Sequence, residues 1–128
     1  MFIGRTEGAR VRWKEYEKKA AAILSSLGIP ARPRQELSSC SLAVQQMVAI
    51  ARAVDMNCKV LILDEPCHGL DESQRRRVLD LLETIAETGT TTLLHVTHDP
   101  TEQLQCEKHI LELHPGEVPM YRLLSDML

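Results

Sequence analysis

The sequence has no apolar run approaching the roughly 20 residues that a helix needs to cross a membrane. Its first residues, MFIGRTEGAR, also lack the basic, apolar and small-residue regions of a secretory signal. These absences predict a cytoplasmic protein that reaches the inner face of a membrane only through a partner. The net charge of −3 provides no concentrated basic surface, so nucleic acid is not an expected partner. The one basic cluster, Arg75 to Arg77, is expected to be a solvated helix face.

Paired metal-binding or redox cysteines are also missing. No C-x-x-C spacing occurs among the four cysteines, which are Cys40, Cys58, Cys67 and Cys106. We therefore expect reduced thiols rather than a disulfide or zinc framework. His95 and His98 are three residues apart, and on a strand this spacing points side chains to opposite faces, which argues against a shared metal.

Residues 1–58 are predicted to form a helical part behind a polar opening loop that contains two glycines. Apolar residues recur at helical spacing from Trp13 to Leu27, and Gly28 is expected to end that helix. Ser41 is a suitable N-cap for a second helix through AVQQMVAIARAV, because its hydroxyl can accept a hydrogen bond from the first turn.

Residues 59–128 are predicted to form an α/β part. The aliphatic segment Lys59–Leu63 is typical of a strand buried on both faces of a parallel sheet. A helix over Glu72–Glu87 and a strand over Thr91–Val96 would complete a right-handed parallel βαβ unit. A short helix is expected after Pro100, and the segments HILEL and MYRLL predict a C-terminal β-hairpin.

The segment LILDEP carries the most informative chemistry. Its aliphatic strand delivers Asp64 and Glu65 to the carboxyl end, where open α/β sheets bind ligands. One carboxylate can hold Mg²⁺ while the other orients or deprotonates an attacking water. Alone, a strand that ends in two acids is equally compatible with a structural or chance feature.

Three further segments accompany LILDEP: CSLAVQQMVAIARAV upstream, and GLD and VTHD downstream. In order and spacing the four segments resemble the signature, Walker B, D-loop and H-loop of ABC transporter ATPases, and the resemblance extends from Phe2 onward. It implies a partial P-loop NTPase fold, with ATP and Mg²⁺ as the ligands. The implied partners are a second ABC ATPase subunit, or another copy of this chain, and a membrane permease.

The resemblance also implies a role for each matching residue. Asp64 would organise Mg²⁺, Glu65 would act on the hydrolytic water, and His98 would contact the terminal phosphate. Asp71 would couple the two sites of a dimer. The signature would cap the terminal phosphate of ATP on the opposite subunit through Ser41, Leu42, Ala43 and Gln45. A serine that opens a helix independently suits an anion, although an ordinary N-cap without a ligand is the alternative.

Two departures from the family pattern stand out. The signature has Leu42 and Ala43 where LSGGQ has glycines, which places side chains where backbone approaches phosphate. Sugar-importer ATPases are similar in this respect, and residues 1–66 resemble them. The tail, TLLHVTHDPTEQLQCEKHILELHPGE, instead resembles ATPases associated with molybdate uptake, which suggests a recombined or engineered sequence.

The phosphate-binding loop G-x-x-x-x-G-K-[ST] does not occur in these 128 residues. We therefore expect the isolated chain to have weak nucleotide affinity and no significant ATPase activity. Three hypotheses stay open: a fragment of an importer ATPase, a non-catalytic module that supplies a signature in trans, and a purely structural fragment. An uncovered sheet edge and apolar face also predict a dimer.

Overall fold

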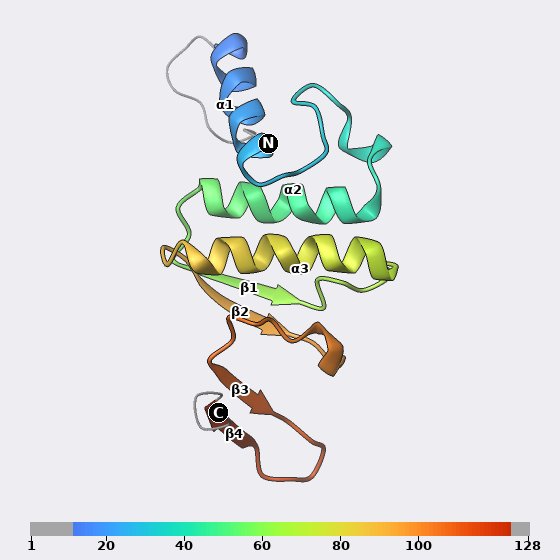
Figure 1. Ribbon diagram of the computed structural model, residues 1–128, viewed down its shortest axis with the longest axis vertical. Coiled ribbons are helices and arrows are strands. Elements are labelled where there is room, and N and C mark those ends of the chain that lie inside the picture. Colours follow the sequence, from blue (N-terminus) through green and yellow to red (C-terminus); the bar gives the residue numbers. More distant parts are fainter. Residues whose placement is uncertain (1–11, 124–128) are drawn as a thin grey trace.

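The computed structural model describes residues 12–123, so the predicted opening loop lies almost wholly outside the described residues. Figure 1 shows stacked layers, with α1 above α2, α2 beside α3, a small sheet under α3, and a hairpin at the far end. The α-helices are α1 (Trp13–Ser26), α2 (Leu42–Asp55) and α3 (Glu72–Glu87). The strands are β1 (Val60–Asp64), β2 (Thr92–Val96), β3 (His109–Glu112) and β4 (Met120–Leu123). Short 3₁₀ helices cover Leu37–Ser39 (η1) and Pro100–Glu102 (η2).

Local sequence accounts for the helix bounds. Gly28, with φ of +65°, follows the last turn of α1, where a left-handed residue is common. Ser41 caps α2, and its hydroxyl accepts a hydrogen bond from the backbone amide of Val44 at 3.3 Å. These two boundaries and the bounds of α3 confirm the predicted helices.

The strands confirm the predicted βαβ unit and hairpin. β1 and β2 pair in parallel, from Val60 opposite Thr92 to Asp64 opposite Val96, and α3 connects them. β3 and β4 pair antiparallel, with Glu112 opposite Met120. The parallel register matters most for function, because it brings the carboxyl ends of β1 and β2 together.

The prediction that β1 is buried on both faces is wrong. Burial alternates along the strand, and Ile62 is 65% exposed. Leu94 and Val96 are exposed on the same face of β2. Within residues 12–123, α3 covers one face of this sheet and no element covers the other. A continuous aliphatic segment therefore has one buried row and one open row.

One apolar core joins the two predicted parts of the chain. Met47 and Ile50 of α2 belong to the same buried cluster as Val78 and Leu82 of α3 and Leu63 of β1. This packing fixes the helix starts relative to the strand ends. No helix among residues 12–123 combines the length and apolar character needed to cross a membrane.

Candidate functional site

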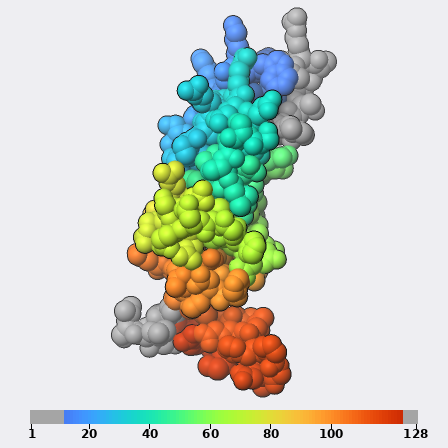
Figure 2. All heavy atoms as spheres, turned by 90° about the vertical axis from the view of Figure 1, so that its right-hand side faces the viewer, coloured from blue at the N-terminus to red at the C-terminus, as the bar shows by residue number. Residues whose placement is uncertain are grey.

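The predicted motifs gather at one end of the layered structure. One side of the molecule in Figure 1 holds the first residues of α2 and α3 and the last residues of β1 and β2. Figure 2 views that side directly. A Cβ placed on Gly69 would lie 3.5 Å from Leu42 Cδ2, so the turn after β1 contacts the start of α2. The predicted site residues at these element ends are Ser41, Leu42, Asp64, Glu65, Asp71 and His98.

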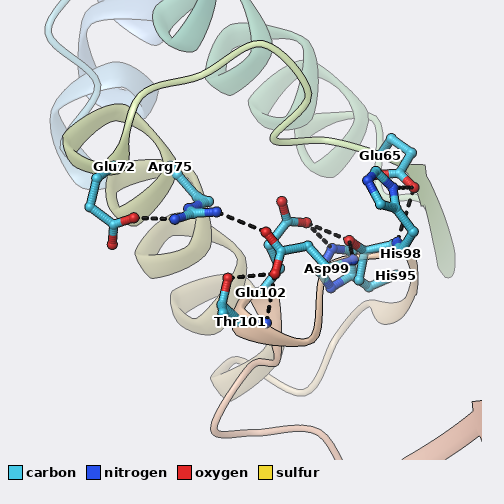
Figure 3. A network of polar contacts seen from close by, with 9 residues as sticks. Glu65, Glu72, Arg75, His95, His98, Asp99, Thr101 and Glu102 are labelled. Atoms are coloured by element: carbon cyan, nitrogen blue, oxygen red, sulfur yellow. Dashed lines mark hydrogen bonds and ion pairs between the residues drawn. The ribbon is translucent and has the colours of Figure 1, made fainter.

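Glu65 and His98 form the centre of this site. Glu65 directly follows β1, and His98 lies two residues beyond β2. The Glu65 amide continues the parallel ladder by donating to the carbonyl of Val96 at 2.8 Å. His98 then donates twice to Glu65 Oε1, from its backbone amide at 3.1 Å and from its ring Nδ1 at 2.6 Å (Figure 3). Among the predicted site residues in the described chain, only this pair shares a side-chain hydrogen bond.

Each member of the pair shifts the pKa of the other. The hydrogen bond to Glu65, followed by the charge of that carboxylate, raises the pKa of His98 above 6.5. The same hydrogen bond holds the pKa of Glu65 below 4.5. Because the His98 side chain is 81% exposed, the imidazolium faces solvent, where an anion can approach it.

The backbone of Glu65 is strained. Its φ of +48° lies in the left-handed region, which non-glycine residues rarely adopt. The ladder bond to Val96 and the two bonds from His98 hold the residue in this conformation. Such strain is concentrated at functional sites, so the geometry supports a chemical role for this carboxylate.

Asp64 ends β1 with an exposed side chain. No group of three or more His, Cys, Asp or Glu side chains within residues 12–123 could hold a metal on its own. Mg²⁺ is usually bound by only one or two carboxylates together with phosphate and water oxygens. A single carboxylate at a strand end therefore fits one ligand position of a magnesium–nucleotide site.

Some residues of the signature pack into the protein, and others are exposed to solvent. The Ala43 side chain is buried, and the side-chain amide of Gln45 donates to the carbonyl of Cys40 at 3.0 Å. Ser41 and Leu42 are exposed at the start of α2. The first amides of the helix, on Leu42 and Ala43, have no intrahelical acceptor and are therefore suited to an anion.

Asp71 has a local structural role that the sequence interpretation missed. Its Oδ1 accepts a hydrogen bond from the backbone amide of Gln74 at 2.8 Å, while the Gln74 side chain accepts one from the Asp71 amide at 3.3 Å. This reciprocal arrangement is a capping box at the start of α3. The spacing of Asp71 and Gln74 in the sequence could have revealed it.

The expectation that Arg75 to Arg77 form a solvated face is wrong for Arg75. Its guanidinium donates to Asp99 Oδ2 at 3.0 Å and also pairs with Glu72, whereas Arg76 and Arg77 are exposed. Arg75 differs from Arg76 and Arg77 because of a tertiary contact: its side chain projects toward the loop after β2 (Figure 3). Sequence patterns within the helix do not reveal that contact.

The His95 side chain is buried between two acids of the C-terminal part. Its Nδ1 lies 3.4 Å from Glu107 Oε1, and its Nε2 lies 3.6 Å from Glu102 Oε2. Glu102 also accepts a hydrogen bond from the Thr97 hydroxyl at 2.8 Å. This arrangement packs the loop after β2 against the strand.

The family model described as "ABC transporter" matches residues 3–68. The galactofuranose transporter ATP-binding protein YtfR of Escherichia coli K12 is 37% identical over 100% of this chain, so the alignment includes the tail. The ribose import ATP-binding protein RbsA of Geobacillus kaustophilus is 34% identical over 90%. This chain spans only 28% and 23% of those relatives.

Solved structures of the bacterial ABC transporter cassette MJ0796 share the architecture. Its dimeric form has 28% sequence identity and a TM-score of 0.71, and the match covers 96% of this chain and 53% of that one. A second dimeric structure of the same cassette, in a post-hydrolysis state bound to ADP and Pi, matches equally well.

Proposed function

Because the chain belongs to the ABC transporter family of ATP-binding proteins, we propose that it supplies the signature, Walker B and switch-histidine parts of an ATP-hydrolysing site that powers import of a small solute. The observation that carries this proposal is the contact between Glu65 and His98 at the carboxyl ends of paired parallel strands. The two relatives described above are named for galactofuranose and ribose, which makes a sugar a reasonable solute class.

The proposed chemistry divides the work among three side chains. Glu65 orients the attacking water and accepts its proton; both contacts with His98 involve Oε1, which leaves Oε2 for that water. His98, whose raised pKa favours the cationic form, stabilises negative charge on the terminal phosphate. Asp64 contributes one oxygen to Mg²⁺, which when bound neutralises phosphate charge.

A complete site also needs a phosphate-binding loop, which we propose comes from elsewhere, either another segment of a longer protein or a second subunit. The exposed start of α2, with Ser41 and Leu42, would then cap the terminal phosphate bound by the opposite subunit of a dimer. A membrane permease is the proposed third component. Without the loop, we propose that the chain alone has no significant ATPase activity.

The test is magnesium-dependent phosphate release from ATP. It is measured for this chain alone, for a P-loop-bearing ATPase subunit alone, and for their mixture. Activity above the sum of the separate components supports the proposal, and Glu65→Gln should abolish the gain. An inactive mixture contradicts a role in trans, while turnover by the chain alone contradicts the dependence on an external loop.

Ser41 allows a matched pair of variants. Asn and Asp both serve as N-caps, so Ser41→Asn and Ser41→Asp should retain α2. Only Ser41→Asp places a negative charge where the phosphate would lie, and we expect it alone to lose the activity of the mixture. Equal activity for the two variants would argue for an ordinary cap that meets no ligand.

A further inference from the structure

Asp99, next to His98, is held by three separate partners. Its Oδ1 accepts hydrogen bonds from the amide and the hydroxyl of Thr101, at 2.9 and 2.6 Å. Its own amide donates to the Thr97 hydroxyl at 3.1 Å. Its Oδ2 accepts from Arg75 Nη1 at 3.0 Å. Thr97 lies just after β2 and Thr101 lies in η2, so Arg75 alone among them ties Asp99 to α3.

The electrostatics agree with this geometry. The hydroxyl of Thr101 is the main cause that lowers the pKa of Asp99 below 3.8, and the charge of Arg75 lowers it further. The Arg75 side chain is only 25% exposed, and Glu72 holds the other guanidinium nitrogen (Figure 3). Because the guanidinium is planar and pre-organised, Arg75 loses less side-chain freedom for each of these contacts than a flexible cation would.

His98 itself has little packing to hold it. Its side chain is exposed, and its hydrogen bonds are made to a carboxylate that is itself partly exposed. The orientation of its ring therefore depends on where the loop backbone lies. That backbone is anchored on one side by the bond from the His98 amide to Glu65 and on the other by the bond from Arg75 to Asp99.

We infer that Arg75 is a positioning residue for the site proposed above: by fixing Asp99 from the first turn of α3, it sets the position of His98 against Glu65. The effect of Arg75 on catalysis rests on the proposed function. The structural link itself, from Arg75 through Asp99 to His98, is independent of any ligand. Arg75 follows the Asp71 cap by one turn, so the first turn of α3 holds both the D-loop aspartate and, through Asp99, the loop of the switch histidine.

The test compares Arg75→Gln with Arg77→Gln in the full 128-residue chain. Both changes remove one arginine from the same helix, but Arg77 is exposed. The primary measurement is the imidazole ¹⁵N and ¹³C spectrum of His98, which reports its hydrogen bond to Glu65. Arg75→Gln should move these resonances toward those of Glu65→Gln, Arg77→Gln should leave them unchanged, and Arg75→Lys should restore them in part.

Amide hydrogen exchange gives a second measurement. Loss of the ion pair should speed exchange at Thr101 by roughly two- to fivefold in Arg75→Gln. If Arg75→Gln fails to fold, Asp99→Asn tests the same pair, because asparagine can still accept from Thr101. A His98 spectrum that is identical in Arg75→Gln, Arg77→Gln and the unsubstituted chain overturns the inference.

The catalytic consequence is measured in the active mixture with the P-loop subunit. Arg75→Gln should lower kcat at least about tenfold with little change in KM for ATP, since misplacement by roughly 1 Å can cost about a hundredfold. An unchanged kcat would overturn the positioning role. If the mixture never hydrolyses ATP, the proposed function fails, whereas the His98 spectrum still decides the link to Arg75.

Discussion

At the scale of single residues, the site depends on one pair of side chains 33 positions apart. Glu65 and His98 meet because β1 and β2 pair in parallel and each residue follows its strand end. Glu65 adopts a strained, positive φ, and its carboxylate contacts His98 in the loop after β2. The side-chain hydrogen bond at 2.6 Å, and after it the opposite charges of the two groups, shift both pKa values in the direction that favours the ion pair.

This ion pair should be visible in a pH titration. His98, with a pKa raised above 6.5, contributes stability that is full below 6.5 and is lost as pH rises through the raised value. Glu65, with a pKa below 4.5, contributes stability present above 4.5 and lost as pH falls through the lowered value. NMR titration in magnesium-free buffer should give a His98 pKa above 6.5, and Glu65→Gln should return it toward 6.5. An identical pKa in the variant would show that the pair does not form.

Cys67 should be the slowest of the four cysteines to react. Burial raises the pKa of its thiol to about 11, against an ordinary value of 9.0, so its thiolate fraction near neutral pH falls about a hundredfold. Its side chain is also inaccessible, while Cys40 and Cys58 are partly exposed free thiols. Iodoacetamide labelling followed by peptide mass spectrometry checks the order, with the urea-unfolded chain as the control in which all four react.

At the scale of elements, the start of α3 has two functions. The Asp71 capping box begins the helix, and one turn later Arg75 reaches the loop that carries His98. The buried face of the helix, with Val78, Leu82 and Ile85, packs into the core and fixes the direction of both residues. A change at the cap is therefore expected to affect the site as well as helix stability.

Asp71→Ala should lower the free energy of unfolding by about 1 kcal/mol, with a range of roughly 0.5–2, because the Gln74 amide loses its acceptor. Asp71→Ser retains a capping oxygen and should recover most of that loss. Urea unfolding followed by circular dichroism measures both variants. Equal unfolding midpoints for alanine and the unsubstituted chain would contradict the capping role.

Much of the element order could be predicted from sequence, because it depends on local patterns. Apolar spacing placed α3 at Glu72–Glu87, and the aliphatic segment before Asp64 placed β1 within one residue. The position of Glu65 at the carboxyl end of β1 followed from the aliphatic segment, and the parallel pairing of β1 with β2 places His98 beside it. By contrast, the exposure of Ile62 depends on what covers the sheet, and the contact of Arg75 depends on how α3 faces a distant loop. Neither can be obtained from a local pattern.

At the scale of the whole molecule, one face of the β1–β2 sheet is not covered by any element within the described residues 12–123. Val60 and Ile62 of β1 and Leu94 and Val96 of β2 form this open sheet face. A contiguous aliphatic patch beside unpaired strand edges favours association.

We expect the 128-residue chain to self-associate at micromolar concentration through the open sheet face. Ile62→Lys combined with Leu94→Lys should shift it toward monomer with little loss of stability, because both side chains are already exposed. Sedimentation velocity over a concentration series measures the change. A monodisperse monomer of the unsubstituted chain would contradict the expectation, and Arg77→Gln serves as a control on a different surface.

The exposed imidazole of His98 has one more consequence. A phosphate that draws this cation away from Glu65 also removes the neighbour that weakens the carboxylate as a base. The affinity of Glu65 for a proton would then rise when a nucleotide arrives and fall when it departs. If the proposed function holds, substrate binding would therefore set the strength of Glu65 as a base, which would stay weak until a nucleotide binds.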